Sequence, residues 1–278
     1  MKPISQLSPS EAAGIKYILM DIDDTLTLNG KLLDASYSAL WKLNKAGFKL
    51  IPVTGRPAGW CDLIAREWPV HGVIGENGAL AFWEEELPDD NNKKLPVLNT
   101  EFHPNAVKND HQTLLRIKER VLKEFPLLRM AKDSFARLFD IAIDFAEEEP
   151  VLPLEIAEKV KKIAEQEGAI AKISSIHVNI WLGKYDKLSM AETFLKNRFG
   201  WEKGKADNEV VFVGDSPNDE PMFERFPLSC AVANISKYKD MIKSLPAYVA
   251  SQEGGHGFAE IAGTILPDFS PHFHNSCT

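Results

Sequence analysis

Short apolar runs alternate with amphipathic segments along the first part of the chain. Residues 15–20 are apolar except for Lys16, which is typical of a strand buried on both faces of a parallel sheet. Two further apolar runs, at residues 48–53 and 72–74, are separated from the first and from each other by segments whose apolar residues recur at helical spacing. This alternation of strand, helix and strand predicts a doubly wound α/β sheet of mainly parallel strands.

Two local signals refine this region. Asn29–Gly30 lies between apolar and β-branched residues, which is a strong signal for a hairpin with a two-residue turn. Asp34 stands where a helix cap is expected, ahead of a helix that Gly47 ends. We therefore expect a small hairpin flap just after the first strand, followed by a helix.

The alternation of buried strands and amphipathic helices stops after residue 82. The stretch EEELPDDNNKKLP, residues 84–96, is polar and rich in turn-forming residues, which predicts either a domain boundary or an exposed hairpin. A half-exposed strand is expected over residues 135–145, where RLFDIAIDF alternates apolar and polar positions, and residues 154–167 follow the pattern of an amphipathic helix. With two more strands expected near residues 170–174 and 176–182, this part predicts a separate α+β module whose sheet has one solvated face.

The first pattern returns at residue 186. A helix is expected over residues 186–200 and a buried strand over residues 209–214, with later strands near 228–233 and 247–250. We therefore predict two domains. A doubly wound, Rossmann-like core comprises residues 1–82 and 186–278, and an inserted α+β domain comprises residues 83–185.

Composition and charge narrow the class of protein. The 278 residues are 44% hydrophobic and 26% charged, as in soluble globular proteins, and a formal net charge of −8 argues against nucleic acid as a partner. The sequence has no apolar run of about 18 residues, and its first residues lack the apolar segment of a secretory signal. Three widely spaced cysteines, Cys61, Cys230 and Cys277, fit free thiols in a reducing compartment. We expect a cytoplasmic protein with no membrane partner, either a monomer or a weak homodimer.

Carboxylates crowd together where the first strand ends. Asp21, Asp23 and Asp24 are three of the four residues at positions 21–24, and such a cluster resists burial unless water or a cation relieves the repulsion. In open α/β sheets the binding site lies outside the carboxyl ends of the strands. Thr54 follows the second strand and Asp215 follows a later one, so both are expected at the same edge.

These positions suggest a site for a metal and a phosphate group. If their strands are neighbours, Asp21 and Asp215 lie within a few ångströms, and Mg²⁺ suits one or two carboxylates together with phosphate oxygens. Lys187 opens a predicted helix, where free N–H groups and the helix dipole favour an anion. A carboxylate nucleophile, a second carboxylate for proton transfer, a hydroxyl and an ammonium would together suit phosphoryl transfer.

Four motifs resemble those of a known family. DIDDT at residues 21–25, VTGRP at 53–57, Lys187 at a helix start and VGDSPND at 213–219 are similar, in order and context, to the motifs of the haloacid dehalogenase superfamily of phosphatases. The insertion between the second and third motifs resembles the α/β cap of the type IIB subfamily, which includes phosphatases of sucrose phosphate and other sugar phosphates. ENGA at residues 76–79 also fits that subfamily.

The resemblance implies a role for each matched residue. Asp21 would be the nucleophile that becomes a phosphoaspartate, and Asp23 the general acid and base whose backbone carbonyl also binds Mg²⁺. Thr54 and Lys187 would bind the phosphoryl oxygens, and Asp215 and Asp219 would complete the metal site. Further residues of the motif loops are expected at the substrate: Gly55, Arg56 and Asn218.

Two points stay open at this stage. Relatives usually carry Lys-Gly after the cap, whereas Leu188 follows Lys187 here, so Lys184 is an alternative phosphate-binding lysine. The candidates for substrate recognition in the cap are Arg137, His177 and Asn179. His177 and Asn179 share a strand face by their spacing, but that face could equally be a solvated surface.

The resemblance thus implies a Mg²⁺-dependent phosphatase that hydrolyses small phosphorylated metabolites, especially sugar phosphates. One alternative is a phosphosugar mutase or other phosphotransferase on the same scaffold. Another, from a different class, is a receiver-like signalling protein that accepts a phosphoryl group. A receiver domain is about half this length, and dehalogenation at carbon would not need the acid that Asp23 supplies.

Overall fold

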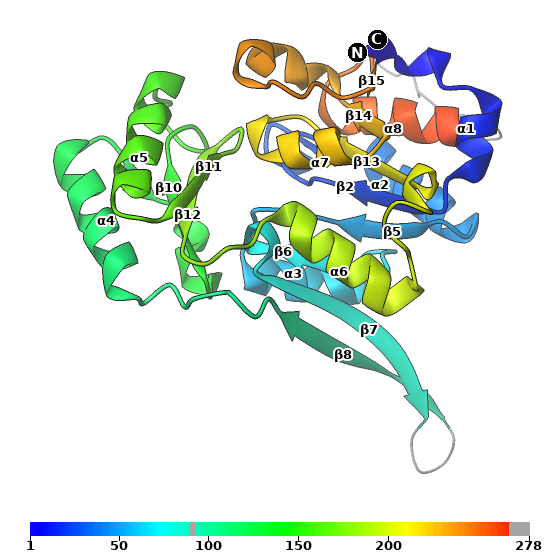
Figure 1. Cartoon of the computed structure of the whole chain (residues 1–278), viewed down its shortest axis with the longest axis horizontal. Helices are drawn as coiled ribbons and strands as arrows, with labels where there is room; N and C mark the ends of the chain where they lie inside the picture. Colours follow the sequence, from blue (N-terminus) through cyan, green and yellow to red (C-terminus); the bar gives the residue numbers. More distant parts are fainter. Residues whose placement is uncertain (89–92, 267–278) are drawn as a thin grey trace, which may run out of the picture.

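A six-stranded parallel sheet forms the centre of the larger of two lobes in the computed structural model, which describes residues 1–88 and 93–266 (Figure 1). Every strand pairing in this sheet is parallel, which confirms the predicted α/β class. The strand order is β1 (Lys2–Pro3), β15 (Tyr248–Val249), β14 (Leu228–Ala231), β13 (Val210–Gly214), β2 (Tyr17–Met20) and β5 (Lys49–Pro52).

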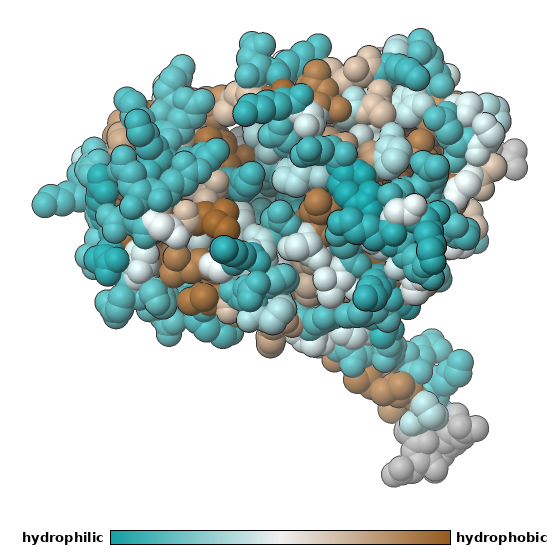
Figure 2. Space-filling model, viewed as in Figure 1, coloured by the Kyte–Doolittle hydropathy of each residue, from teal (hydrophilic) through white to brown (hydrophobic). Residues whose placement is uncertain are grey.

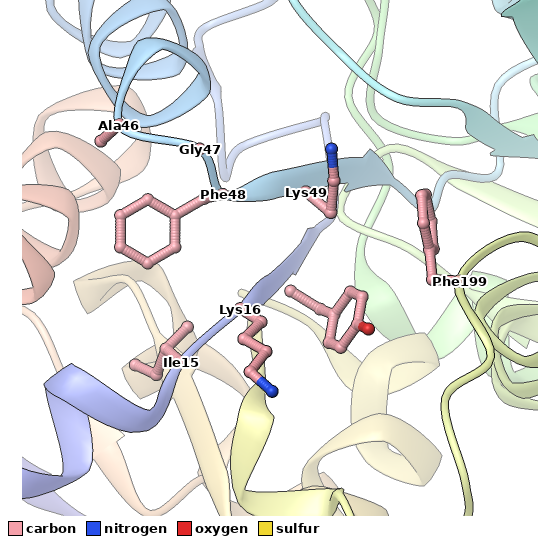
Figure 3. Close-up of a pocket in the computed structure, with 8 residues that line it drawn as sticks. Ile15, Lys16, Ala46, Gly47, Phe48, Lys49 and Phe199 are labelled. Carbon is pink, nitrogen blue, oxygen red and sulfur yellow. The ribbon is translucent and has the colours of Figure 1, made fainter.

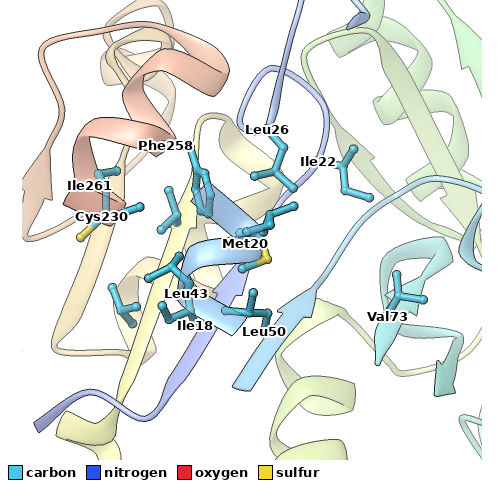
Figure 4. Close-up of a cluster of buried hydrophobic side chains, with 14 of the residues drawn as sticks. Ile18, Met20, Ile22, Leu26, Leu43, Leu50, Val73, Cys230, Phe258 and Ile261 are labelled. Atoms are coloured by element: carbon cyan, nitrogen blue, oxygen red, sulfur yellow. The ribbon is translucent and has the colours of Figure 1, made fainter. Parts of the chain in front are cut away.

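Helices cover both faces of this sheet. One face packs against α1 (Pro9–Gly14), α2 (Asp34–Lys45), α3 (Ala58–Glu67) and α8 (Gly254–Ile265), and the other against α6 (Lys187–Phe199) and α7 (Glu220–Arg225). Strand β2 serves both layers, because Ile18 and Met20 point to the first and Leu19 to the second. Figure 4 shows the first layer, where Ile18 and Met20 lie near Phe258 of α8. Burial on both faces is why the strand is continuously apolar.

The smaller lobe, residues 112–181, has a core of its own. Its antiparallel sheet has the order β11 (Ile170–Ile173), β12 (His177–Trp181), β10 (Asp140–Asp144) and β9 (Arg129–Met130). One face packs against α4 (Gln112–Glu124) and α5 (Leu154–Gln166). Every residue of β10 and β12 is buried, so the half-exposed strand predicted over residues 135–145 is wrong in length and in exposure. The polar face of this sheet meets the larger lobe, where Asn179 of β12 donates to the Gly55 carbonyl at 3.5 Å.

Two hairpins match the turn signals. The predicted flap is present as β3 (Thr27–Leu28) and β4 (Lys31–Leu32), with positive φ angles at Asn29 and Gly30 as a two-residue turn requires. The described parts of the polar stretch, on either side of residues 89–92, belong to an exposed hairpin of β7 (Leu80–Pro88) and β8 (Lys94–Phe102), which projects from the body beside β6 (Val73–Gly75). Most of the viewed surface is hydrophilic, with hydrophobic residues showing on this hairpin (Figure 2). The predicted domain boundaries stay a prediction.

Some local predictions need correction or lie outside the description. Leu33, not Asp34, is the cap residue of α2, and Asp34 is the first helical residue. Cys61 and Cys230 are buried free thiols, while Cys277 lies outside the described residues. None of the helices in the described ranges is long and apolar enough to cross a membrane. The remaining short helices are 3₁₀ turns at Ile4–Gln6, Glu76–Gly78, Lys132–Ala136, Asp207–Glu209, Pro217–Asp219 and Ala233–Met241.

Candidate active site

Three aspartates meet at the carboxyl edge of the parallel sheet. Asp21 follows β2 and Asp215 follows β13, and these strands pair with Met20 opposite Val213. Asp219 lies four residues after Asp215, in the 3₁₀ turn that Ser216 caps. All three side chains are buried, and each offers a carboxylate oxygen within 4.8 Å of the others. The strand order therefore brings together residues that are nearly two hundred positions apart.

Lys187 joins this cluster from the start of α6. Its Nζ lies 2.9 Å from Asp21 Oδ2 and 2.8 Å from Asp219 Oδ1, and the residue is buried. Asp186 caps the helix by accepting a hydrogen bond from the Ser189 N–H, which fixes the position from which Lys187 reaches inward. Lys184 is exposed, and its carbonyl accepts a hydrogen bond from Asn105. Of the two lysines considered from the sequence, Lys187 is the one at the cluster.

The carboxylates of Asp219 and Asp215 differ in the hydrogen bonds that they accept. Both oxygens of Asp219 accept hydrogen bonds, Oδ1 from Lys187 and Oδ2 from the N–H groups of Asp215 and Ser216. Asp215 Oδ1 accepts from the Thr25 hydroxyl at 3.2 Å. Asp215 Oδ2 is buried and finds no hydrogen-bond partner among the described residues.

Burial makes the cluster electrostatically unfavourable without a further cation. It raises the pKa of Asp21 to about 7, an effect that Lys187 opposes and that Asp219 and Asp23 reinforce. Burial, with Asp219 and Asp21 nearby, also holds the pKa of Asp215 well above its ordinary value. Three carboxylates face one ammonium, so the site carries an excess of negative charge when ionised.

A divalent cation fits this donor set. The unpaired Oδ2 of Asp215 and the carboxylate of Asp21 are oxygen ligands of the kind that Mg²⁺ and Ca²⁺ prefer. Asp219 is already held by an ammonium and two backbone N–H groups, so it suits a supporting position beside the ligands better than a direct one.

Asp23 occupies a different environment from Asp21. Its side chain is 16% exposed, and both its oxygens accept hydrogen bonds from the Arg56 guanidinium at 2.8–3.0 Å. Thr54 is buried, and its hydroxyl accepts the Arg56 N–H at 3.1 Å. Asn218 is buried in the turn after β13, where its Oδ1 accepts from Ser216.

The candidate residues of the smaller lobe are held by polar contacts at or near the boundary between the lobes. Arg137 donates to the carbonyl of Gly55 at 2.9 Å and to Asp140 at 2.8 Å, and Asn179 donates to Asp140 at 3.0 Å. His177 lies 2.9 Å from Glu147. None of these three side chains faces a solvated surface, since all three are buried. A role for them in substrate recognition stays a prediction.

Sequence reasoning missed several acids at this interface, of which Glu76 and Asp133 are buried and Glu147 is partly exposed. Glu76 accepts hydrogen bonds from four backbone N–H groups, that of Ala58 and those of residues 138–140. Asp133 and Glu147 both bind Arg56. The positive φ of Glu76 belongs to an Asn-Gly turn that the sequence does reveal, but only the tertiary structure shows where the acids point.

A cavity of about 340 Å³ opens beside Asp23, between the lobes. Polar groups from both lobes line it: Asp23, Asp24, Thr27, Asn29, Arg56, Glu147 and Ser175. A second cavity, of about 390 Å³, lies among Lys16, Phe48, Lys49 and Phe199, at the amino ends of β2 and β5 (Figure 3). The first is at the same end of the sheet as the aspartates and is the candidate pocket for a substrate.

The chain resembles known proteins over most of its length. A family model described as haloacid dehalogenase-like hydrolase matches residues 18–260. A phosphoglycolate phosphatase of Methanobrevibacter smithii is 27% identical over 250 residues, covering 88% of this chain and 96% of the relative. One of Nitrosopumilus maritimus is 26% identical over 259 residues, covering 90% and 96%.

Solved structures share the fold at lower identity. A Thermoplasma acidophilum protein superposes with a TM-score of 0.64 at 20% identity, covering 90% of this chain and 98% of that one. The sucrose-phosphatase of Synechocystis, in complex with sucrose and phosphate, has a TM-score of 0.57 at 15% identity, covering 90% and 97%. The two-lobed arrangement is therefore one that other proteins adopt.

Proposed function

The chain belongs to the haloacid dehalogenase-like hydrolases, and from this membership we propose that it is a Mg²⁺-dependent phosphatase of small phosphate monoesters, chiefly sugar phosphates. One observation carries the proposal, namely the cluster in which Lys187 joins Asp21 and Asp219 beside the unpaired oxygen of Asp215. A nucleophile, a cation and metal ligands are the parts that phosphoryl transfer requires.

Asp21 would act as the nucleophile. Its Oδ1 accepts the Ile22 N–H at 2.8 Å and its Oδ2 faces Lys187, so the carboxylate is held in one orientation at the strand end. A carboxylate oxygen attacks phosphorus, the bond from phosphorus to the alcohol oxygen breaks, and a phosphoaspartate forms. Water then attacks phosphorus, releasing phosphate and restoring Asp21.

Asp23 would transfer the protons. It borders the cavity and is partly exposed, so it can donate a proton to the departing alcohol oxygen and take one from the attacking water. Lys187 and the Thr54 hydroxyl would hold the phosphoryl oxygens. Mg²⁺ held by Asp21 and Asp215, with the Asp23 carbonyl contributing and Asp219 in support, would supply positive charge for the phosphoryl group.

The pocket lining favours a substrate that carries no charged group besides its phosphate. Hydroxyl, amide and carboxylate groups of Thr27, Asn29, Ser175 and Asp24 are suitable partners for sugar hydroxyls. Its one lining guanidinium, Arg56, is already bound to carboxylates, among the residues that the structure describes. A second anionic group on the substrate would meet Asp24 and Glu147, which supports sugar phosphates over phosphoglycolate.

A turnover screen tests the proposal. Phosphate release would be measured with Mg²⁺ for hexose, pentose and triose phosphates and for phosphoglycolate, the substrate in the names of two relatives. We expect hydrolysis, with sugar phosphates preferred. Preference for phosphoglycolate would overturn the substrate class, and absence of turnover for every ester would overturn the phosphatase.

A further inference from the structure

Arg56 connects the two lobes at the point where Asp23 lies. Its Nε and Nη2 donate to both oxygens of Asp23, which belongs to the larger lobe. The same guanidinium donates from Nη1 to Asp133 at 3.2 Å and from Nη2 to Glu147 at 2.9 Å, and both of these acids belong to the smaller lobe. One cation is thus shared by three carboxylates from two bodies of the molecule.

The position of this guanidinium is strongly constrained. Its side chain is 5% exposed, and its Cζ lies 4.3 Å from the centre of the Trp60 ring. Its backbone is held as well, because the Arg56 N–H binds the Thr54 hydroxyl and its carbonyl accepts the Glu76 N–H. Since a guanidinium presents its donors in a rigid plane, fixing that plane fixes the orientation of the carboxylate it grips.

The two acids of the smaller lobe are themselves held in place. Asp133 accepts hydrogen bonds from Arg137, which also reaches the carbonyl of Gly55 next to Arg56. Glu147 is bound by His177 at 2.9 Å, and its pKa is lowered to about 2 by that hydrogen bond and by the charge of Arg56. The smaller lobe therefore presents two ordered acceptors to Arg56 when the lobes are together.

We propose that Arg56 is a positioning residue that makes the orientation of the Asp23 carboxylate depend on the docking of the smaller lobe. The inference rests on the proposed function, in which Asp23 transfers protons at the leaving group. With the lobes together, Asp133 and Glu147 hold the guanidinium plane, and the plane holds Asp23 beside the cavity. If the lobes separate, Arg56 loses two of its three carboxylate partners and Asp23 loses its fixed support.

Two matched substrates can separate this role from a general loss of structure. Phenyl phosphate and p-nitrophenyl phosphate have nearly the same shape, but nitrophenolate leaves readily without a proton and phenolate does not. Loss of a correctly placed acid should therefore slow phenyl phosphate much more than p-nitrophenyl phosphate. For Arg56→Met we expect kcat/KM for phenyl phosphate to fall by about tenfold more than kcat/KM for p-nitrophenyl phosphate, since kcat/KM covers departure of the phenol and not the later hydrolysis of the phosphoaspartate that both esters share.

Other variants make the test specific. Asp23→Asn should show the same selective loss, and adding Arg56→Met to it should cause little further loss, because both act on one step. Glu147→Gln and Asp133→Asn should shift the ratio of the two rates in the same direction to a smaller extent, and Arg56→Lys should restore part of it. Arg129→Met is the matched control, because Arg129 binds Asp144, Glu148 and Pro150 within the smaller lobe.

The outcomes are distinguishable from failure of the proposed function. If the unmodified protein hydrolyses neither ester nor any sugar phosphate, the phosphatase proposal fails before any variant is considered. If it does hydrolyse them, equal losses for both esters in Arg56→Met, or losses that add fully to those of Asp23→Asn, would overturn the positioning role. Should Arg56→Met fail to fold in a thermal melt, Glu147→Gln decides, since Glu147 is 29% exposed and an unchanged ratio there would also overturn it.

Discussion

The ammonium of Lys187 lies 2.9 Å from Asp21 Oδ2, although the two residues are 166 positions apart in the sequence. Asp21 leaves the end of β2, and Lys187 begins α6, which packs on one face of the same sheet. Because both groups are buried, their attraction is little screened by solvent. The ion pair therefore fixes the side chain that we propose as the nucleophile.

Lys187→Met should reduce turnover by at least about a hundredfold, since it removes a buried charge aimed at both the nucleophile and the phosphoryl group. Lys184→Met is the matched control, because Lys184 is exposed and three residues away. Phosphate release with Mg²⁺ measures both variants. Comparable losses in the two would mean that the position of Lys187 in the cluster has no catalytic significance.

Asp21→Asn should abolish turnover while leaving a folded protein, because the amide keeps the shape of the side chain but is a very weak nucleophile. The control is Asp62→Asn, which alters a surface pair with Arg66 and should leave kcat unchanged. Circular dichroism would establish folding, and phosphate release would measure turnover. Activity near that of the unmodified protein in Asp21→Asn would remove the proposed mechanism.

Mg²⁺ should stabilise the protein more at about pH 8 than at about pH 5.5. The pKa of Asp21 is raised to about 7, so the metal must displace a proton below that pH and competes less well there. For the metal-free protein the sign is opposite. A folded-state pKa above the ordinary value gives a stabilising contribution at low pH that is lost as the pH rises through about 7.

Thermal melts with Mg²⁺ and with a chelator, at both pH values, measure this linkage. The increase in Tm caused by Mg²⁺ should grow with pH, and Asp21→Asn should reduce that growth, leaving the part that comes from Asp215, whose pKa is also raised. An increase that is equal at the two pH values, or larger at the acidic one, would show that Asp21 does not share its oxygens with the ion.

The sequence predicts the carboxylate cluster because a general rule applies to it. Residues that follow neighbouring parallel strands meet at one edge, and β2 and β13 are adjacent, so Asp21 and Asp215 had to converge. Lys187 could be placed at a helix start, but the choice between it and Lys184 depended on the direction in which α6 packs. The rule predicts at which edge of the sheet the site lies, but it does not predict which lysine side chain reaches that edge.

The interface between the lobes could not be predicted in this way. The alternation of residues 140–144 indicates one polar face, and water and another lobe are equally compatible with that pattern. Arg56 meets Asp133 and Glu147 only because the lobes dock, and no local periodicity encodes the docking. The cap residue of α2 lies one position before the predicted Asp34, because Leu33 has the extended backbone that a cap position needs.

Glu76→Ala should lower the free energy of unfolding by about 3 kcal/mol or more, because it leaves three buried N–H groups and one partly buried N–H group without their acceptor. Three of these N–H groups belong to residues 138–140 of the smaller lobe, so the loss should also weaken the attachment of the smaller lobe to the larger one. Glu67→Ala, at an exposed position of α3, should change stability by less than about 0.5 kcal/mol. Urea denaturation of both variants measures the difference, and a loss below about 1 kcal/mol in Glu76→Ala would contradict the structure.

Gly78→Ala should impair catalysis as well as stability. Gly78 has φ of +103°, and a β-carbon there would collide with the backbone carbonyl of Asp186, the residue that caps α6 and precedes Lys187. Gly204 is a matched site, since its φ is +81° and a β-carbon would meet no described atom within 4 Å. Gly204→Ala should therefore cost about 1 kcal/mol from backbone strain alone, with kcat unchanged.

In Gly78→Ala the same strain is joined by a displacement of the Asp186 backbone. Lys187 must stay within hydrogen-bonding distance of Asp21. A shift of up to about 1 Å at the start of α6 should therefore lower kcat by about tenfold to a hundredfold. Thermal melts and phosphate release on the two alanine variants separate strain from displacement. Equal kcat values in the two would mean that the loop at Gly78 does not set the position of the lysine.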